Sequence, residues 1–312
     1  MRIMLHLRDL PQGRSSEQEE YAAPPGPRLS HRKDDPEPPP YDPWLSVPDS
    51  TLLPPPPPIS EVLSPTANAD YDDAARAQAW CRQNPLWRPQ LHSQQNLRRI
   101  ADGAVQLTAP PSANRTVSIR QIGHGQTHIR TTPKCTDSIF LSDLPVYAAS
   151  TQSPTTIYFE IKVLSVCSES RRGDTDAGIA IGLLAPPYPS WRLPGWERAS
   201  LGVHGDDGRR YVDNAYGGPE FTQSFRTGDV VGMGMTFPPP LCQGGKKRVK
   251  VFFTRNGKPD GDWDLHEERD SAQDGGDVTG LKGEHDILAA VGCFGGVEFE
   301  TKFRRDLWMY RP

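Results

Sequence analysis

The sequence predicts an all-β fold, an antiparallel β-sandwich, from three observations. Several short runs alternate apolar and polar residues, which is the side-chain period of a strand with one buried face. Residue pairs that favour tight reversals, Asp207-Gly208 and Asn256-Gly257, lie between such runs. The sequence shows no long helical pattern. Many short strands with frequent turns are typical of a sandwich.

The first folded elements are expected between residues 69 and 150. A short helix is predicted over 71–81, because Asn68 or Asp70 can cap it, its first turn is acidic and Pro85 follows it. The apolar side chains expected to anchor this segment on the sandwich are Trp80, Leu86 and Trp87. Further short strands are predicted at 105–107, 117–122 and 138–141.

The clearest strand patterns follow residue 150. Alternation is strongest in 156–163 and recurs in 297–303. Short apolar runs bounded by glycine, typical of strands buried on both faces, occupy 177–183, 230–235 and 288–293. One hairpin is predicted to turn at 206–208 and another at Asn256-Gly257. Phe253 and Cys293 are assigned to the core, and the acidic, glycine-rich stretch 267–284 is expected to form a surface loop.

Residues 1–68 predict a disordered tail. Of the 33 prolines in the 312-residue chain, many lie here, and few residues are available for burial, which favours disorder with local polyproline II. Pro38, Pro39, Pro40 and Tyr41 form a PPxY sequence. A polyproline segment loses little entropy on docking, so a WW domain can take the prolines in its aromatic groove and Tyr41 in a second pocket.

Composition argues against several classes of function. The net charge is only −4 and basic residues are scattered, so we expect no nucleic-acid partner. No segment approaches the ~20 apolar residues of a membrane span, so a soluble, intracellular chain is expected. The five cysteines form neither a CxxC pair nor a disulfide framework, and no cofactor or metal is predicted. The motifs GxSxG, Walker A and HExxH are missing, so we expect no enzyme activity.

The stretch 191–218, followed by 228–232 and 251–257, resembles the SPRY domain in order and spacing. The resemblance is strongest at Arg192-Leu193-Pro194-Gly195-Trp196, Asp206-Asp207-Gly208-Arg209 and 252–257. SPRY domains, which are B30.2-like, are concanavalin-like sandwiches that bind other proteins. The resemblance implies a concanavalin-like SPRY sandwich at 151–312, with 69–150 as an extension packed on it and 1–68 as the tail.

With its PPxY motif, the chain resembles fungal endosomal SPRY adaptors of WW-domain HECT ubiquitin ligases. The sandwich is then expected to bind a cargo protein while the tail recruits the ligase for ubiquitin-dependent sorting, in the cytoplasm with recruitment to endosomes and without a membrane span. The alternative is a SPRY scaffold subunit of a larger complex, of the chromatin methyltransferase or Ran-binding-type ligase kind, which leaves a nuclear location open. A concanavalin-like lectin is a third reading.

The candidate partner surface lies on loops between the predicted strands. Exposed aromatic side chains held on a rigid scaffold are frequent hot spots of recognition, and nearby charges orient a partner. Trp196 is interpreted instead as a structural corner, because Pro194 and Gly195 precede it. The residues predicted to bind the partner are Tyr188, Trp191, Arg192, Asp206, Asp207, Arg209 and Tyr216.

Overall fold

The structure is a computed structural model that describes residues 71–113, 115–167, 177–215, 217–237, 248–267 and 278–312. The tail 1–68 with its PPxY motif lies outside the described residues, and so does Tyr216.

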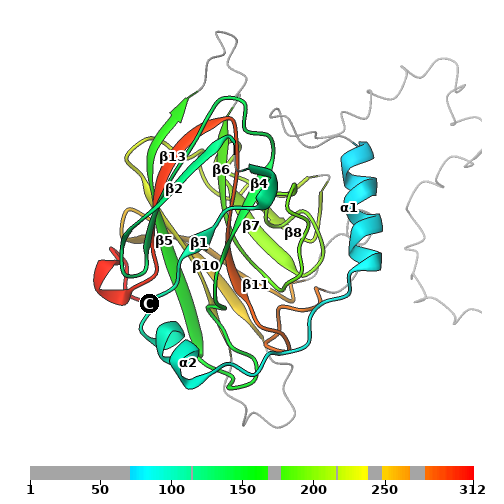
Figure 1. Cartoon of the computed structure of the whole chain (residues 1–312), viewed down its shortest axis with the longest axis vertical. Coiled ribbons are helices and arrows are strands. Elements are labelled where there is room, and N and C mark those ends of the chain that lie inside the picture. Colours follow the sequence, from blue (N-terminus) through cyan, green and yellow to red (C-terminus); the bar gives the residue numbers. More distant parts are fainter. Residues whose placement is uncertain (1–70, 114, 168–176, 216, 238–247, 268–277) are drawn as a thin grey trace, which may run out of the picture. The chain divides into compact units, whose positions relative to one another are not determined.

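Two antiparallel sheets form the fold, as the sequence predicts (Figure 1). The first contains, in spatial order, β1 (Leu107–Thr108), β4 (Ser138–Ser142), β12 (Leu288–Phe294), β6 (Gly178–Leu184), β7 (Ser200–His204) and β8 (Arg210–Val212). The second contains β11 (Lys258–Asp264), β10 (Lys250–Arg255), β9 (Val230–Thr236), β5 (Thr156–Cys167), β13 (Gly296–Lys302), β3 (Gln126–Thr131) and β2 (Val117–Gly123).

The core lies between these sheets. Phe140 of the first sheet meets Phe299 of the second edge to face, with ring centroids 6.2 Å apart. Phe253 and Cys293 are fully buried, which confirms their assignment to the core. The apolar runs predicted to be buried on both faces form β6, β9 and β12, and all three are largely buried.

The two predicted hairpins are confirmed. Asn256 and Gly257 have φ angles of 51° and 76°, the left-handed values that a type I′ turn needs, and they join β10 to β11. The 206–208 turn joins β7 to β8, with Gly208 at a φ of 71°. A Cβ at Gly208 would lie 2.0 Å from the carbonyl oxygen of Thr222, so only glycine fits there.

The segment before residue 150 contains predicted and unpredicted elements. The helix forms as α1 (Tyr71–Gln83), and the strands expected near 105, 117 and 138 form as β1, β2 and β4. The sequence analysis missed β3 and α2 (Gln94–Ala101), which Ser93 caps by accepting a hydrogen bond from the backbone N–H of Asn96 at 3.2 Å. Trp80 and Leu86 are partly buried, whereas the Trp87 side chain is 55% exposed and its backbone N–H donates to the Pro186 carbonyl at 2.9 Å.

Two expectations about exposure are wrong. Residues 278–284 belong to the predicted surface loop, yet Val278 and Leu281 are buried in the core. The alternation in 156–163 predicts one buried face, yet Tyr158 and Glu160, at the polar positions of that alternation, are 5% and 1% exposed. Neither helix in the described ranges is long and apolar enough to cross a membrane.

Candidate functional site

Hydrogen bonds bring together the loops that carry the predicted partner residues. The Pro194 carbonyl contacts Nε2 of His204 at 2.9 Å, and the Gly195 carbonyl accepts from the backbone N–H of Asn214 at 3.0 Å. The Arg209 Nη1 donates to the carbonyl of Gly218 at 3.2 Å. The loop before β7, the β7–β8 hairpin and the loop after β8 therefore lie side by side, and we call their described residues 189–196, 206–209, 213–215 and 217–218 the loop face.

Tyr188 does not lie on that surface, and its predicted exposure is wrong. Its hydroxyl is buried, donates to the carbonyl of Leu193 at 2.6 Å and accepts from the backbone N–H of Glu197 at 3.0 Å. Burial raises the pKa of Tyr188 far above its usual value. Tyr188 therefore fixes the loop from inside rather than contacting a partner.

Arg192 is also buried, with a side chain that is 0% exposed, so its predicted place at the surface is wrong in this conformation. Its Nε donates to Oε1 of Glu197 at 2.8 Å, and its guanidinium lies over the ring of Trp196, 4.4 Å from the centroid. Burial raises the pKa of Glu197, while Arg192 opposes that rise. Trp196 is 3% exposed, which agrees with its interpretation as a structural corner.

Trp191 is half-buried because two residues of α1, spaced one helical turn apart, contact its ring. Trp80 of α1 meets its ring edge to face at 6.3 Å between centroids. The Arg76 guanidinium of the same helix lies 4.7 Å from the Trp191 ring centroid. Trp191, one of the aromatic residues predicted to bind the partner, is therefore already in contact with this chain's own helix.

The β7–β8 turn keeps its predicted residues partly exposed and oriented. Asp207 accepts from the backbone N–H of Arg209 at 2.9 Å through Oδ1 and from the hydroxyl of Tyr211 at 2.7 Å through Oδ2. Asp206 shares the turn, and its carbonyl accepts from the Ser224 hydroxyl at 3.0 Å. The turn thus presents acidic side chains beside Arg209 on a fixed backbone.

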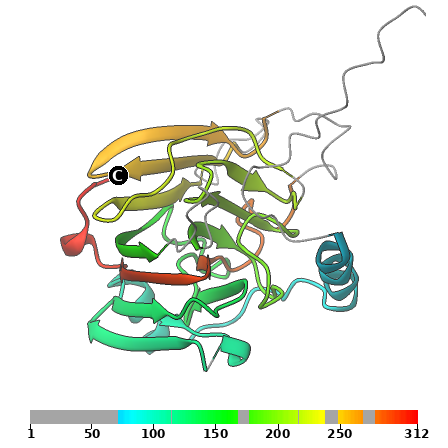
Figure 2. The same cartoon turned by 90° about the horizontal axis from the view of Figure 1, so that it is seen from above.

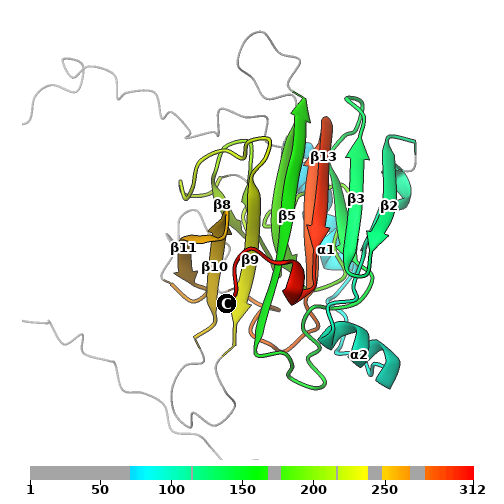
Figure 3. The same cartoon turned by 90° about the vertical axis from the view of Figure 1, so that its left-hand side faces the viewer.

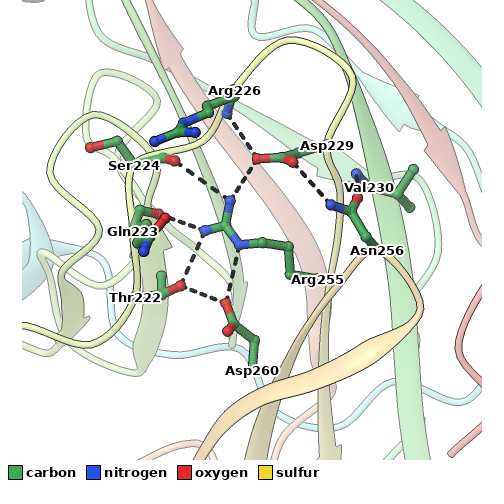
Figure 4. A network of polar contacts seen from close by, with 9 residues as sticks. All are labelled: Thr222, Gln223, Ser224, Arg226, Asp229, Val230, Arg255, Asn256 and Asp260. Carbon is green, nitrogen blue, oxygen red and sulfur yellow. Dashed lines mark hydrogen bonds and ion pairs between the residues drawn. The ribbon is translucent and has the colours of Figure 1, made fainter.

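A second network, which the sequence analysis did not identify, fixes the loop 221–229 beside this turn (Figure 4). Arg255, the last residue of β10, donates to Asp229 at 2.6 Å and to Asp260 at 3.1 Å. It also donates to the Thr222 hydroxyl at 3.1 Å and to the carbonyls of Gln223 and Ser224. All three guanidinium nitrogens are used, so one side chain holds a whole loop in place.

Asp229 strengthens this network as an anion. Burial opposes its ionisation, but hydrogen bonds from the Arg226 backbone and Asn256, together with the ion pair to Arg255, lower its pKa overall. The loop in turn touches the β7–β8 turn, because the backbone N–H of Thr222 donates to the Gly208 carbonyl at 2.8 Å. In the sequence, the only pattern near Arg255 is the Asn256-Gly257 turn. It predicts a hairpin, but it does not predict that Arg255 binds the loop 221–229.

The described residues contain no group of three or more His, Cys, Asp or Glu side chains arranged to hold a metal ion. The described part of the loop face presents the half-buried ring of Trp191, the oriented side chains of Asp207 and Arg209, and backbone groups.

Comparison with known proteins identifies a SPRY domain in this chain. Residues 156–262 match the SPRY domain. A SPRY domain-containing protein of Schizosaccharomyces pombe is 36% identical over 101 residues, which cover 32% of this chain and 22% of that protein. The Ran-binding proteins 9/10 homolog of Drosophila melanogaster is 37% identical over 103 residues, covering 32% of this chain and 9% of that protein.

Human Ran-binding protein 9 is 36% identical over 100 residues, covering 32% of this chain and 11% of that protein. The match to each of these relatives therefore spans less than a quarter of the relative's length. Among solved structures, a human SPRY domain aligns with a TM-score of 0.40 and 23% identity, over 60% of this chain and 96% of that chain.

Proposed function

This chain contains a SPRY domain, a protein-interaction fold, and we propose that it acts as a non-catalytic adaptor that binds a partner protein through the loop face. The observation that carries the proposal is the construction of that face. Three loops meet there, Asp207 and Arg209 are oriented by hydrogen bonds, and Arg255 fixes the neighbouring loop. A preorganised surface loses little entropy on binding, which favours recognition.

The other arm of the proposed adaptor is the PPxY motif, in which Pro38, Pro39 and Tyr41 recruit a WW-domain HECT ubiquitin ligase. Binding of cargo by the loop face and of the ligase by the tail raises the effective concentration of one for the other. The chain then directs cargo into ubiquitin-dependent sorting, in the cytoplasm and at endosomes.

Affinity purification of the full chain from cells tests both arms together. Wild type is compared with Tyr41→Ala and with Tyr21→Ala, a matched tyrosine in the same tail outside the motif. A HECT ligase that is lost only with Tyr41→Ala supports the adaptor. Ligase capture that is equal in all three proteins contradicts a role for the motif.

A second candidate function has a specific observation in its favour. The similarity to Ran-binding protein 9 and to the Ran-binding proteins 9/10 homolog favours a scaffold subunit of a larger complex of the Ran-binding ligase kind. A scaffold of the chromatin methyltransferase kind is the other form of this alternative. In that case the tail is only a linker. The same purification distinguishes the two functions, because a multi-subunit complex that is unchanged by Tyr41→Ala selects the scaffold.

A further inference from the structure

Helix α1 covers part of the loop face. Its inner side consists of small residues, with Ala74, Ala77 and Cys81 buried. Ala74 belongs to a small apolar cluster that is separate from the main core, and the other members of that cluster are Leu193, Trp196, Tyr211 and Ala215. Figures 1 and 2 show α1 as a separate rod beside the sandwich, on the side of β7 and β8.

The contacts that hold α1 are limited in kind. Alanine side chains bury little apolar area, so this helix gains less from burial than one docked through leucine or phenylalanine. At its C-terminal end, Nη2 of Arg198 donates to the carbonyl of Cys81 at 3.3 Å and to the carbonyl of Asn84. On its flank, Arg76 and Trp80 contact Trp191. These contacts can open without breaking a strand pairing.

Hydrogen-bond donors under and beside α1 lack acceptors. The Nη1 and Nη2 atoms of Arg192 are buried without a hydrogen-bond partner among the described residues, and so are the indole Nε1 atoms of Trp191 and Trp196. A buried donor without an acceptor carries a desolvation cost that a matching acceptor removes. The helix presents alanine methyl groups to this cluster rather than oxygen atoms.

Helix α1 contacts the residues on both sides of Arg192 in the chain, because Arg76 and Trp80 meet Trp191 and Ala74 packs in one cluster with Leu193. Burial raises the pKa of Cys81, on the inner side of α1, to about 11, and the charges of Arg198 and Arg192 oppose that rise. Burial also raises the pKa of Asp137. The charge of Arg192 lowers that pKa, and the charge of Asp73 on α1 raises it. Arg192, with its two unpaired guanidinium nitrogens, therefore lies between two residues that α1 contacts.

We propose that α1 is a displaceable cover of the loop face, and that the partner segment which replaces it carries a carboxylate that pairs with Arg192. This inference rests on the proposed function, because it names the chemistry of the partner at the same face. Two guanidinium nitrogens on one side match the two oxygens of a carboxylate, which is the geometry that Arg recognises best. Such a segment supplies the acceptors that α1 does not.

The first test measures whether α1 opens by itself. The full chain is treated with N-ethylmaleimide under native conditions, and labelling of Cys81 and Cys293 is followed by mass spectrometry. Cys81 lies on α1 and is buried where the helix packs on the sandwich, whereas Cys293 is buried in the sandwich core. We expect Cys81 to react on the order of tenfold faster or more, because local opening needs less free energy than global unfolding.

Two substitutions on the same helix sharpen this test. Ala77→Glu places a charge on the buried side, and Ala75→Glu places it on the exposed side. We expect Ala77→Glu to accelerate labelling of Cys81 a further tenfold or so while leaving Cys293 unchanged, and Ala75→Glu to change neither. A common rate for Cys81 and Cys293 in the wild type and in Ala77→Glu would show that α1 opens only with the whole fold, and would overturn the cover.

The second test addresses the carboxylate. A random dodecapeptide library is selected on the full-chain Ala77→Glu variant, with wild type and Ala75→Glu as controls. We expect the variant to enrich peptides that contain Asp or Glu, and the Asn or Gln version of each peptide to bind about tenfold more weakly. Enrichment of peptides without acidic residues, equal binding of the amide versions, or no enrichment over the controls would overturn the proposed chemistry.

Neither readout uses a cellular partner. The affinity purification described above is also examined for cargo proteins. If thiol labelling and peptide selection give the expected results but that purification recovers no cargo, the proposed function fails and the cover stands. If cargo is recovered while Cys81 and Cys293 react at one rate, the cover fails and the proposed function stands.

Discussion

Two segments that flank the sandwich in sequence pack on it in opposite ways. The C-terminal segment 303–310 lies along the outer side of the second sheet, near β5 and β9 (Figure 3). Its backbone N–H groups at Met309 and Tyr310 donate to the buried carboxylate of Glu160 at 2.8 Å and 2.9 Å. The Trp308 ring meets Tyr158 edge to face, with 4.9 Å between centroids.

The comparison with α1 separates a permanent contact from a removable one. At the C-terminal segment, a buried carboxylate receives donors from the segment that covers it, and aromatic rings supply the apolar area. At α1, two buried guanidinium nitrogens of Arg192 and two buried indole donors have no acceptor among the described residues, and alanine supplies the apolar area. Completed polar contacts make a cover part of the fold, whereas incomplete ones leave room for a better occupant.

The largest expected loss of stability comes from the sandwich core, and it is the reference for the α1 and C-terminal contacts. Phe253 is fully buried between the sheets and packs against the rings of Phe221 and Phe225. Phe253→Ala should lower the free energy of unfolding by about 3 to 5 kcal/mol, because it removes a large buried side chain and leaves a cavity. Urea denaturation followed by tryptophan fluorescence measures this, and a loss below about 1 kcal/mol would contradict the assignment to the core.

Removing Glu160 should cost nearly as much. Glu160→Ala leaves the backbone N–H groups of Met309 and Tyr310 without their acceptor, and we expect a loss of about 2 to 3 kcal/mol by the same denaturation. Glu300, a partly exposed glutamate on β13, is the matched control, and Glu300→Ala should change stability by about 0.5 kcal/mol or less. Equal effects of the two substitutions would remove the C-terminal segment from the fold's permanent contacts.

Substitution of Asp137 is expected to stabilise the protein, unlike the two substitutions above. Burial raises its pKa to about 6, against a usual value of 3.8, although Arg192 opposes the rise. The folded state therefore holds this proton more tightly, so stability falls as the pH rises from about 4 to about 6. Asp137→Asn should then stabilise the protein by about 2 kcal/mol at pH 7 and by close to nothing at pH 4.

The measurement is the difference in unfolding free energy between Asp137→Asn and wild type at several pH values. A gain that is constant from pH 4 to pH 7 would show that ionisation of Asp137 is not its source. Such a result would mean that ionising the buried Asp137 side chain costs the folded protein no free energy.

The sequence predicted those elements whose signals are local. The Asn256-Gly257 turn and the alternation in β5 depend on neighbouring residues, and both hairpins and most strands were found from them. The burial of Tyr158 and Glu160 was missed because it depends on a segment about 150 residues away. The strand β3 was missed because its sequence, Gln-Thr-His-Ile-Arg-Thr, is mostly polar although it is largely buried.

The sequence predicted which loops form the candidate site, but not which of their side chains are exposed. Arg192 looked like a surface charge, and only Glu197, five residues later, indicates the buried ion pair. Tyr188 looked like an exposed anchor because its backbone partners lie in a loop that has no regular pattern. The engagement of Trp191 by α1 joins segments more than 100 residues apart, and no local signal reports it.

The smallest expected effect on stability is at the loop face itself. Trp191 is half-buried and contacts α1, and Arg209 is partly exposed, with its Nη2 3.9 Å from the exposed Glu220. If α1 is a removable cover, Trp191→Ala combined with Arg209→Ala should cost only about 1 kcal/mol and move the melting temperature by a few degrees. The same variant should lose partner affinity by about 2 kcal/mol or more, because truncated aromatic and arginine anchors dominate binding at such surfaces.

Calorimetry of unfolding and binding of the purified partner measure the two quantities side by side, with Glu220→Ala as a control at the exposed end of the Arg209 pair. Glu220→Ala should keep both stability and affinity, since an exposed ion pair of this length contributes little. If the double variant unfolds as readily as Phe253→Ala, then Trp191 and Arg209 belong to the fold and α1 is as permanent as the C-terminal segment. The partner surface must then lie elsewhere on the sandwich.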